Sequence, residues 1–305
     1  MSVFHLWFRK TLYCNQEKTM KEVEMVFIVP FVSEDRSGNW NLACLHLEQT
    51  IASIFNSQDP RFAVVVAGND EPAFAFPDDE RFSFVQVASQ LLSADECPFA
   101  YSRRDKVAKV AAAWQYAKDK WECQYAMKVD ADDFISSRLV GWVASQSRAA
   151  AYVVKNGWAW RDGAKYWIER FDGFDQSCGT SVIVRSDLAD LPVTLENHED
   201  YQYEGLDVVD GSDSGHLLVA ESRTLLVNNR HSRTLGRFRE HGYAVLGIPF
   251  SAAIYRVGNI HSLSRRDHRV HSLRMWLGRM RRIRLITSKL RQEFMIPKIS
   301  SYGIS

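Results

Sequence analysis

Three aspartates, Asp130, Asp132 and Asp133, follow directly on the apolar segment of residues 125–129 (YAMKV). The apolar, β-forming composition of that segment predicts a buried strand. Carboxylates at the carboxyl end of such a strand lie where open α/β sheets bind their ligands. Mg²⁺ and Mn²⁺ typically take one or two carboxylates and complete their shells with phosphate oxygens and water. The sequence therefore predicts a cation site at Asp130 and Asp132, where the metal would neutralise a departing diphosphate.

The plain alternative is a solvated acidic turn whose aspartates cap the following helix. Asp133 can fill that capping role even where Asp130 and Asp132 hold a metal. The elements around the turn bear on the choice between the two interpretations.

Strand-like and helix-like segments alternate in the first half of the chain. Residues 25–31 and 62–67 are continuous apolar runs, which predict strands buried on both faces, and residues 82–87 predict a shorter strand. Hydrophobic residues recur at mainly helical spacing in residues 41–55, and residues 106–120 are rich in alanine, which also predicts a helix. This alternation predicts an α/β fold with a mostly parallel central sheet flanked by helices, in which the aspartates follow the fourth strand.

The pattern changes after residue 134. We expect a helix over residues 137–150 and a long, polar, acidic loop over residues 190–215, and such loops are often functional. Shorter segments predict further strands at residues 151–154, 166–170, 180–185 and 253–257.

The segment Lys128-Val129-Asp130-Ala131-Asp132-Asp133 after an apolar strand resembles the DxD motif of GT-A-fold glycosyltransferases, especially those of family 2. The resemblance covers roughly residues 24–262. It implies a Rossmann-like GT-A fold and transfer of a sugar from a nucleoside-diphosphate donor to a hydroxyl of a glycan or glycolipid, with inversion, as in polysaccharide biosynthesis. It also implies that Asp132 binds Mn²⁺ or Mg²⁺ directly and that Asp130 reaches the ribose or the metal through water.

Other segments are similar to parts of the family's donor site. Asp70 ends the second strand, where a carboxylate can accept a hydrogen bond from a base N–H. Basic side chains near a helix N-terminus favour phosphate. For these segments an Asn-Asp turn and a solvated helix face are the plain alternatives. The resemblance assigns the donor nucleotide to Pro30, Phe31, Asp70, Asp105, Lys106, Lys109 and Asp130.

The resemblance assigns the donor sugar to Asp133 and to the loop before the strand at residues 180–185, with Cys178 and Gly179. Glycine there lets backbone approach the sugar closely. His261 is similar to the family's C-terminal metal-binding histidine, a few residues later than the usual spacing, and a surface histidine is the alternative.

An inverting transferase needs a base to deprotonate the acceptor hydroxyl. His198-Glu199-Asp200 matches the family's base motif in letters, which makes Asp200 one candidate. Counting back from His261 places His231 in the same slot, and the sequence leaves both open.

Charge divides the chain into an acidic body and a basic end. Residues 265–305 hold 11 Lys or Arg and 2 Asp or Glu, whereas the whole chain has a net charge of +1. We expect an N-terminal extension (1–22), a GT-A domain (23–264) with nucleotide-binding (23–134) and acceptor-binding (135–264) halves, and a basic amphipathic helical tail (265–305).

The tail has ten Lys or Arg between residues 265 and 291, with apolar residues at three- and four-residue steps. Such a helix can lie on an anionic membrane beside a lipid-linked acceptor, or it can pack on the acidic body. Nucleic acid is not an expected partner. Five cysteines without a CxxC pair, and no apolar run of about 20 residues, predict a cytoplasmic protein, with the inner membrane face as a peripheral site.

Three other classes of protein compete with a glycosyltransferase. A nucleotidyltransferase of similar build would use the same metal pair but consume a nucleoside triphosphate. It generally carries a Gly-rich basic loop after the first strand, where residues 31–39 have one Gly and one Arg. A haloacid-dehalogenase-type phosphatase has its DxD on the first strand. A catalytically inactive, membrane-peripheral interaction protein is the non-enzyme alternative.

Overall fold

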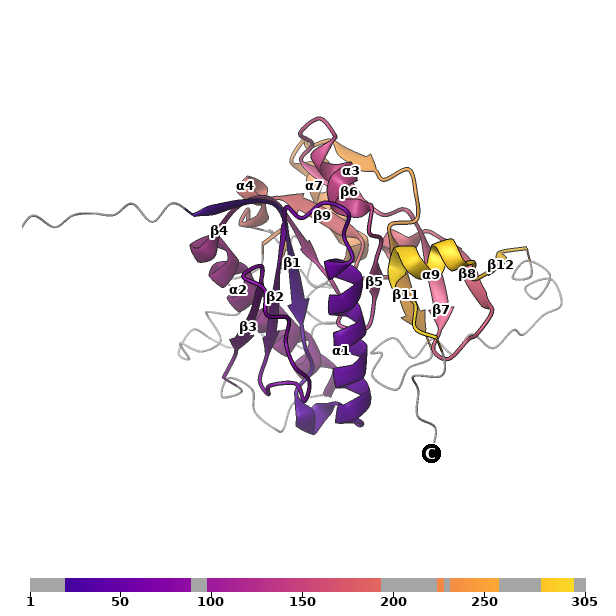
Figure 1. Cartoon of the computed structure of the whole chain (residues 1–305). Helices are drawn as coiled ribbons and strands as arrows, with labels where there is room; N and C mark the ends of the chain where they lie inside the picture. Colours follow the sequence, from indigo (N-terminus) through magenta and orange to yellow (C-terminus); the bar gives the residue numbers. More distant parts are fainter. Residues whose placement is uncertain (1–19, 89–97, 193–223, 228–230, 258–280, 299–305) are drawn as a thin grey trace, which may run out of the picture.

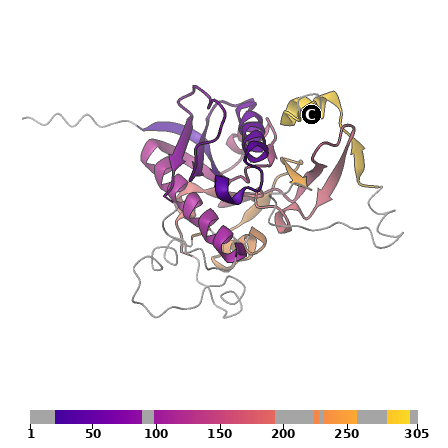
Figure 2. The same cartoon turned by 90° about the horizontal axis from the view of Figure 1, so that it is seen from below.

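The computed structural model describes residues 20–88, 98–192, 224–227, 231–257 and 281–298. The described chain forms two sheets, with helices on both faces of the larger one (Figure 1). A view from below shows the long helices on opposite sides of that sheet (Figure 2).

The larger sheet has seven strands in the order β10-β6-β9-β4-β1-β2-β3. β3, β2, β1 and β4 run parallel to one another, and β9 pairs antiparallel with both β4 and β6. This confirms the predicted mostly parallel sheet, and only the short strand β10 was not predicted. The strands are β1 (Lys21–Pro30), β2 (Phe62–Gly68), β3 (Phe82–Gln86), β4 (Trp121–Lys128), β6 (Ala151–Val153), β9 (Val182–Arg185) and β10 (Val245–Gly247).

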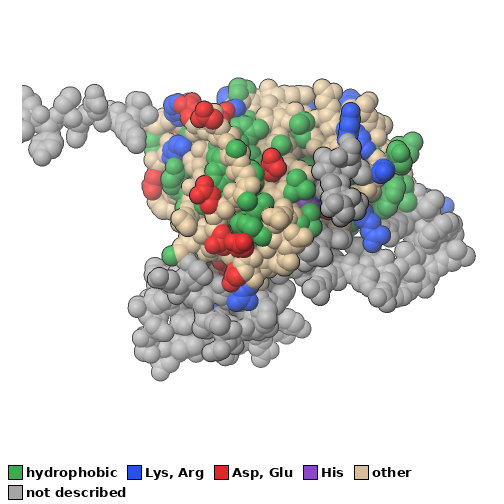
Figure 3. Space-filling model, turned by 60° about the horizontal axis from the view of Figure 1, so that its bottom comes forward, with side chains coloured by type: hydrophobic (Ala, Val, Ile, Leu, Met, Phe, Trp, Pro, Cys, Tyr) green, Lys and Arg blue, Asp and Glu red, His purple; other side chains and the backbone are tan. Residues whose placement is uncertain are grey.

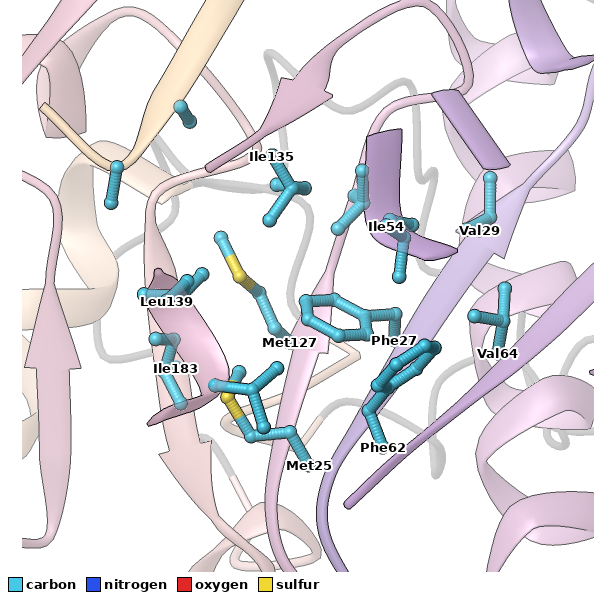
Figure 4. Close-up of a cluster of buried hydrophobic side chains, with 14 of the residues drawn as sticks. Met25, Phe27, Val29, Ile54, Phe62, Val64, Met127, Ile135, Leu139 and Ile183 are labelled. Atoms are coloured by element: carbon cyan, nitrogen blue, oxygen red, sulfur yellow. The ribbon is translucent and has the colours of Figure 1, made fainter. Parts of the chain in front are cut away.

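Both faces of the larger sheet are buried, which explains why its strands are continuous apolar runs. Phe27 and Met127 lie on one face with Ile54 of helix α1 (Trp40–Phe55), and Figure 4 shows these side chains in one cluster with Phe62. The intervening residues, such as Ile28, lie in a second cluster on the other face. The sheet is therefore the middle layer of three.

Helices α1 (Trp40–Phe55) and α3 (Leu139–Ala144) pack on the first face, and α2 (Pro98–Lys120), α4 (Ser186–Ala189) and α7 (His231–Glu240) on the second. Helix α2 begins earlier than predicted, at Pro98, a residue suited to a first helical turn. Helix α3 is shorter than the predicted helix over 137–150, because the chain leaves it at Ser145 and continues to the buried strand β6.

The smaller sheet has five strands in the order β12-β8-β7-β11-β5. Its strands are β5 (Phe134–Ile135), β7 (Asn156–Arg161), β8 (Trp167–Asp172), β11 (Ala253–Val257) and β12 (Ile283–Leu285). A third apolar cluster, which includes Phe134, Trp160 and Phe294, joins this sheet to helix α9 (Ser288–Phe294).

The predicted continuous helix in the tail is wrong for its described end. Residues 283–285 form β12, which pairs with β8, and helix α9 begins only at Ser288. The edge of β8 offers unpaired backbone groups, and the Thr287 hydroxyl accepts the Leu290 N–H at 3.2 Å, which starts a new helix there.

The same segment packs on the body. The Asn56 side chain donates to the carbonyl oxygen of Gln292 at 2.8 Å, and Glu293 pairs with Arg138. No described helix is long and apolar enough to cross a membrane.

Candidate active site

Residues 130–133, here called the acidic turn, connect the two sheets. β4 ends at Lys128, the Asp133 N–H donates to the Asp130 carbonyl oxygen at 3.0 Å, and β5 begins at Phe134. The Val129 N–H donates to the Ile28 carbonyl oxygen, so the turn leaves the sheet at the carboxyl ends of β4 and β1. The predicted position of the aspartates is confirmed, and the strand that follows them excludes the alternative in which they cap a helix (Figure 1).

Asp133 lies beneath the surface, with none of its side chain exposed. Its carboxylate accepts hydrogen bonds from the Thr180 hydroxyl, the Cys178 thiol and the Arg256 N–H. Burial and the charges of its two neighbouring aspartates raise the pKa of Asp133 well above its ordinary value. The predicted contact of Asp133 with a donor sugar is therefore corrected: its oxygens already bind the protein, and it supports the turn from below.

Asp130, by contrast, is partly exposed and held from two sides. One carboxylate oxygen lies 2.5 Å from the Lys106 ammonium. The other lies so close to Gly179 that a Cβ there would approach it to 2.8 Å. Burial disfavours the charged form of Lys106, but the charge and hydrogen bond of Asp130 outweigh it and raise the pKa of Lys106. Gly179 is thus required by the close approach of Asp130, a reason that its sequence position does not reveal.

Thr180 and Lys128 were missed by the sequence analysis. The Thr180 hydroxyl accepts the Asp130 N–H at 2.9 Å and donates to Asp133, so it joins the exposed and the buried aspartate. Lys128 is buried, and burial with the charge of Lys106 lowers the pKa of Lys128 to about 8. A signal was available for each, because a small hydroxyl residue follows Gly179 and a charged residue interrupts an apolar strand.

The residues predicted to contact the nucleotide are divided between surface and core. Phe31 is 1% exposed and packs against Trp40 at 5.0 Å between ring centroids. Pro30 is also buried, in the β1–β2 pairing. Neither side chain is open to a ligand here, because both are buried and Phe31 packs against the first residue of α1.

The polar members of that set lie closer together. Lys109 forms an ion pair with Asp105 at 2.6 Å, and burial lowers the pKa of Lys109 and raises that of Asp105. The charge of Asp70 also acts on Lys109, and the Asp70 carboxylate accepts the Glu34 N–H at 2.8 Å. Segments after β1 and β2 and the first part of α2 thus bring charged groups together beside Lys106 and the acidic turn.

The acidic turn offers the right atoms for a hard divalent cation. Asp130 and Asp132 are both partly exposed and present oxygen ligands. Among the described residues no group of three or more His, Cys, Asp or Glu side chains could hold a metal ion. The two carboxylates therefore fit a cation that keeps most of its shell for phosphate oxygens and water, as Mg²⁺ commonly does.

Of the remaining predicted residues, Cys178 is 1% exposed, and burial raises the pKa of its thiol well above the ordinary value. It contacts Asp133 and is not open to a sugar. His231 is the first residue of α7, which contacts the short 3₁₀ helix η3 (Phe174–Gln176) in the loop before β9. Asp200 and His261 lie outside the described residues.

A buried polar cluster supports the acidic turn from the smaller sheet and α1. Arg256 is fully buried, donates to the Gln49 side chain at 2.6 Å and lies 3.6 Å from Asp162. The His46 ring lies 3.2 Å from Asp162, and the Thr50 hydroxyl donates to the Ala131 carbonyl oxygen at 3.0 Å. Thr50 thus holds the backbone of the turn, and Arg256, whose N–H binds the Asp133 carboxylate, is itself held by Gln49 and Asp162. The sequence did not connect either α1 or β11 with the turn.

A comparison with solved protein structures finds 69 chains that resemble this one. Residues 1–349 of TarS from S. aureus match with a TM-score of 0.40 and 12% identity, over 77% of this chain and 60% of that one. A protein described as a nucleotide-diphospho-sugar transferase from Desulfovibrio desulfuricans matches with a TM-score of 0.33 and 12% identity, over 74% and 80%. The inositol-1-phosphate CTP transferase of T. maritima matches with a TM-score of 0.36 and 11% identity, over 80% and 94%.

No protein-family model and no curated protein sequence matches the chain. The chain spans 60% of the TarS structure. The class of the molecule follows from its own sheets: it is a mixed α/β protein with a mostly parallel central sheet and an acidic turn at the carboxyl ends of its central strands.

Proposed function

We propose that the protein is a metal-dependent glycosyltransferase that moves a sugar from a nucleoside-diphosphate donor to a hydroxyl of a glycan or lipid-linked acceptor. One observation carries the proposal: Asp130 and Asp132 are partly exposed on a turn whose third aspartate is buried and fixed. A turn that only met solvent would not need Asp133, Thr180 and Arg256 packed beneath it.

In this proposal Asp132 and Asp130 hold Mn²⁺ or Mg²⁺, which when bound would neutralise the leaving diphosphate. Lys106 provides a second positive charge at the same place, within reach of Asp130. Asp70 and Asp105 hold the nucleotide, and Lys109, which is 1% exposed, acts on it through its ion pair with Asp105. Gly179 keeps the space beside the Asp130 carboxylate open.

Deprotonation of the acceptor is assigned to Asp200 or His231, with inversion by direct displacement, and His261 is assigned to the metal shell. A peripheral position on the cytoplasmic face of a membrane, near a lipid-linked acceptor, completes the proposal. A nucleotidyltransferase is the second candidate, because the same acidic turn suits a nucleoside triphosphate equally well.

A thermal-shift screen of UDP-, GDP- and dTDP-sugars and of nucleoside triphosphates, each with and without Mn²⁺, tests the proposal. A ligand at 100 times its Kd stabilises a protein by about 2.7 kcal/mol, which corresponds to several °C for a chain of this size. We expect a Mn²⁺-dependent shift with one class of nucleotide-sugar and slow release of its sugar. A shift with nucleoside triphosphates alone would favour the nucleotidyltransferase, and no shift with any nucleotide would reject both.

A further inference from the structure

The edge of the smaller sheet where β8 meets β12 exposes two large apolar side chains. Tyr166 is 72% exposed and Leu285 is 74% exposed, which makes them the two most exposed large hydrophobic residues in the described part of the chain. They lie on successive rungs of the β8–β12 ladder, because the Ile286 N–H donates to the Tyr166 carbonyl oxygen at 2.9 Å and Leu285 lies opposite Trp167. Since side chains alternate between the faces of a sheet, Tyr166 and Leu285 flank this edge from its two faces. Large side chains exposed together mark an interaction surface more often than isolated ones do.

Basic side chains surround this pair. Residues 165–170 and 281–289, here called the basic edge, contain six basic residues and one acidic residue, Glu169. All six basic residues are exposed: Lys165, Arg170, Arg281, Arg282, Arg284 and Lys289. Figure 3 shows Lys and Arg side chains beside apolar ones on the side of the molecule where Figure 1 places β8, β12 and α9, whereas Asp and Glu gather on the other side.

The composition of the basic edge distinguishes between partners. A protein–protein interface has an apolar core inside a polar rim, and two apolar side chains make a small core for one. A nucleic acid would use the basic residues but has no use for an exposed leucine. A bilayer interface uses all of them, because aromatic and aliphatic side chains enter the interfacial layer while Lys and Arg reach the lipid phosphates.

The chain that precedes β12 carries the same charge, whereas Asp172, the last residue of β8, forms an ion pair with Arg170. Residues 265–280, which lie outside the described part, hold five Arg and one Asp, and they lead directly into β12. The rest of the protein is net acidic, so a membrane with anionic lipids would attract this end and repel the body.

We propose that the basic edge docks the protein on an anionic lipid surface, with Tyr166 and Leu285 in the interfacial layer and the basic side chains at the lipid phosphates. This inference rests on the surface alone, and it holds or fails independently of the donor chemistry.

The full chain should be tested by co-sedimentation with vesicles of phosphatidylcholine alone and with about one-third phosphatidylglycerol. We expect binding only to the anionic vesicles, and its loss in 1 M salt, because exposed charges are then screened. The double variant Tyr166→Ser/Leu285→Ser should bind at least tenfold more weakly. Leu246→Ser is the matched control, because Leu246 is exposed on β10 of the other sheet and should leave vesicle binding unchanged.

Four outcomes would overturn the inference. The first three are no binding of the wild-type chain to anionic vesicles, equal binding by the folded double variant, and equal loss in Leu246→Ser. Equal binding by the double variant would place the attachment in residues 265–280. The fourth is displacement of the wild type and of the double variant from vesicles by the same amount of single-stranded RNA, because this would indicate a general polyanion site. The donor-dependent thermal shift, measured on the same variants, should not change.

Discussion

The acidic turn and the basic edge both concentrate charge, but they hold it in opposite ways. At the acidic turn, Asp133 accepts three hydrogen bonds from buried partners, and Asp130 is held between Lys106 and Gly179. At the basic edge, the basic side chains of β12 and its neighbours are exposed. The carboxylates of the first region are fixed by protein partners, whereas the basic side chains of the second face solvent.

This difference indicates a division of roles. Group transfer with a metal requires oxygen ligands fixed to within a fraction of an ångström, which a buried support provides. A lipid surface has no fixed pattern of charge, so long and exposed side chains suit it better. Substitutions in one region should therefore leave the other region unaffected.

The largest effect should follow loss of the Phe294 ring. Phe294 is fully buried in the apolar cluster that joins α9 to the smaller sheet. Phe294→Ala should lower the free energy of unfolding by about 3–5 kcal/mol. Denaturant unfolding measures this, with Met295→Ala as the control, because Met295 is 45% exposed and its loss should cost no more than about 0.5 kcal/mol. A cost below about 1 kcal/mol for Phe294→Ala would show that α9 does not anchor the basic edge.

A smaller loss of stability should separate the aspartates of the acidic turn. Asp133→Ala removes the acceptor of three buried donors, and each buried donor left unsatisfied costs about 1–3 kcal/mol before the site relaxes. We expect a total loss of about 2–4 kcal/mol. Asp132 is the preceding residue but is partly exposed, so Asp132→Ala should change stability by less than about 1 kcal/mol. Equal losses would mean that Asp133 has no special structural role.

Gly179→Ala should damage the acidic turn with little effect on the fold. The new Cβ would lie 2.8 Å from an Asp130 oxygen, so the carboxylate must move. We expect a loss of about 1–2 kcal/mol in stability and about 10- to 100-fold in metal-dependent donor turnover. Gly236→Ala is the control: it lies within α7 with no atom closer than 3.9 Å, and alanine should stabilise that helix by about 0.5–1 kcal/mol.

The smallest effect should come from Lys106→Met. Lys106 now pairs with the carboxylate that would bind the metal. Its removal should strengthen Mn²⁺ binding in the absence of nucleotide by about fivefold, the equivalent of about 1 kcal/mol for a partly exposed pair. The same variant should bind a nucleoside diphosphate more weakly. Calorimetric titration measures both. Weaker Mn²⁺ binding in Lys106→Met would contradict the idea that Lys106 and the metal compete for the Asp130 carboxylate.

The first half of the fold was predictable because its strands are buried on both faces. β1, β2 and β4 must be apolar at nearly every position, which leaves a clear pattern in the sequence. The smaller sheet leaves a weaker pattern. β7 (NGWAWR) is only partly buried and begins with Asn and Gly, and β12 exists only because β8 offers it an edge.

The amino-acid sequence does not show which aspartates of the acidic turn are exposed and which is buried. Asp130, Asp132 and Asp133 are the same residue type, and their environments differ because of distant partners. Arg256 lies 123 positions and Thr180 lies 47 positions from Asp133. Spacing placed the turn correctly at the end of β4, but only the packing of β9 and β11 shows which carboxylate is buried.

The most direct measurement is the thermal shift caused by the preferred nucleoside-diphosphate sugar, with and without Mn²⁺, in the wild-type chain and in Asp132→Ala. If Asp132 binds the cation that joins donor to protein, the wild type should gain several °C more with Mn²⁺ than without it, and Asp132→Ala should lose that difference while its unliganded Tm stays within a few °C of the wild-type value. A metal-dependent shift of the same size in the folded Asp132→Ala variant would contradict the proposed site.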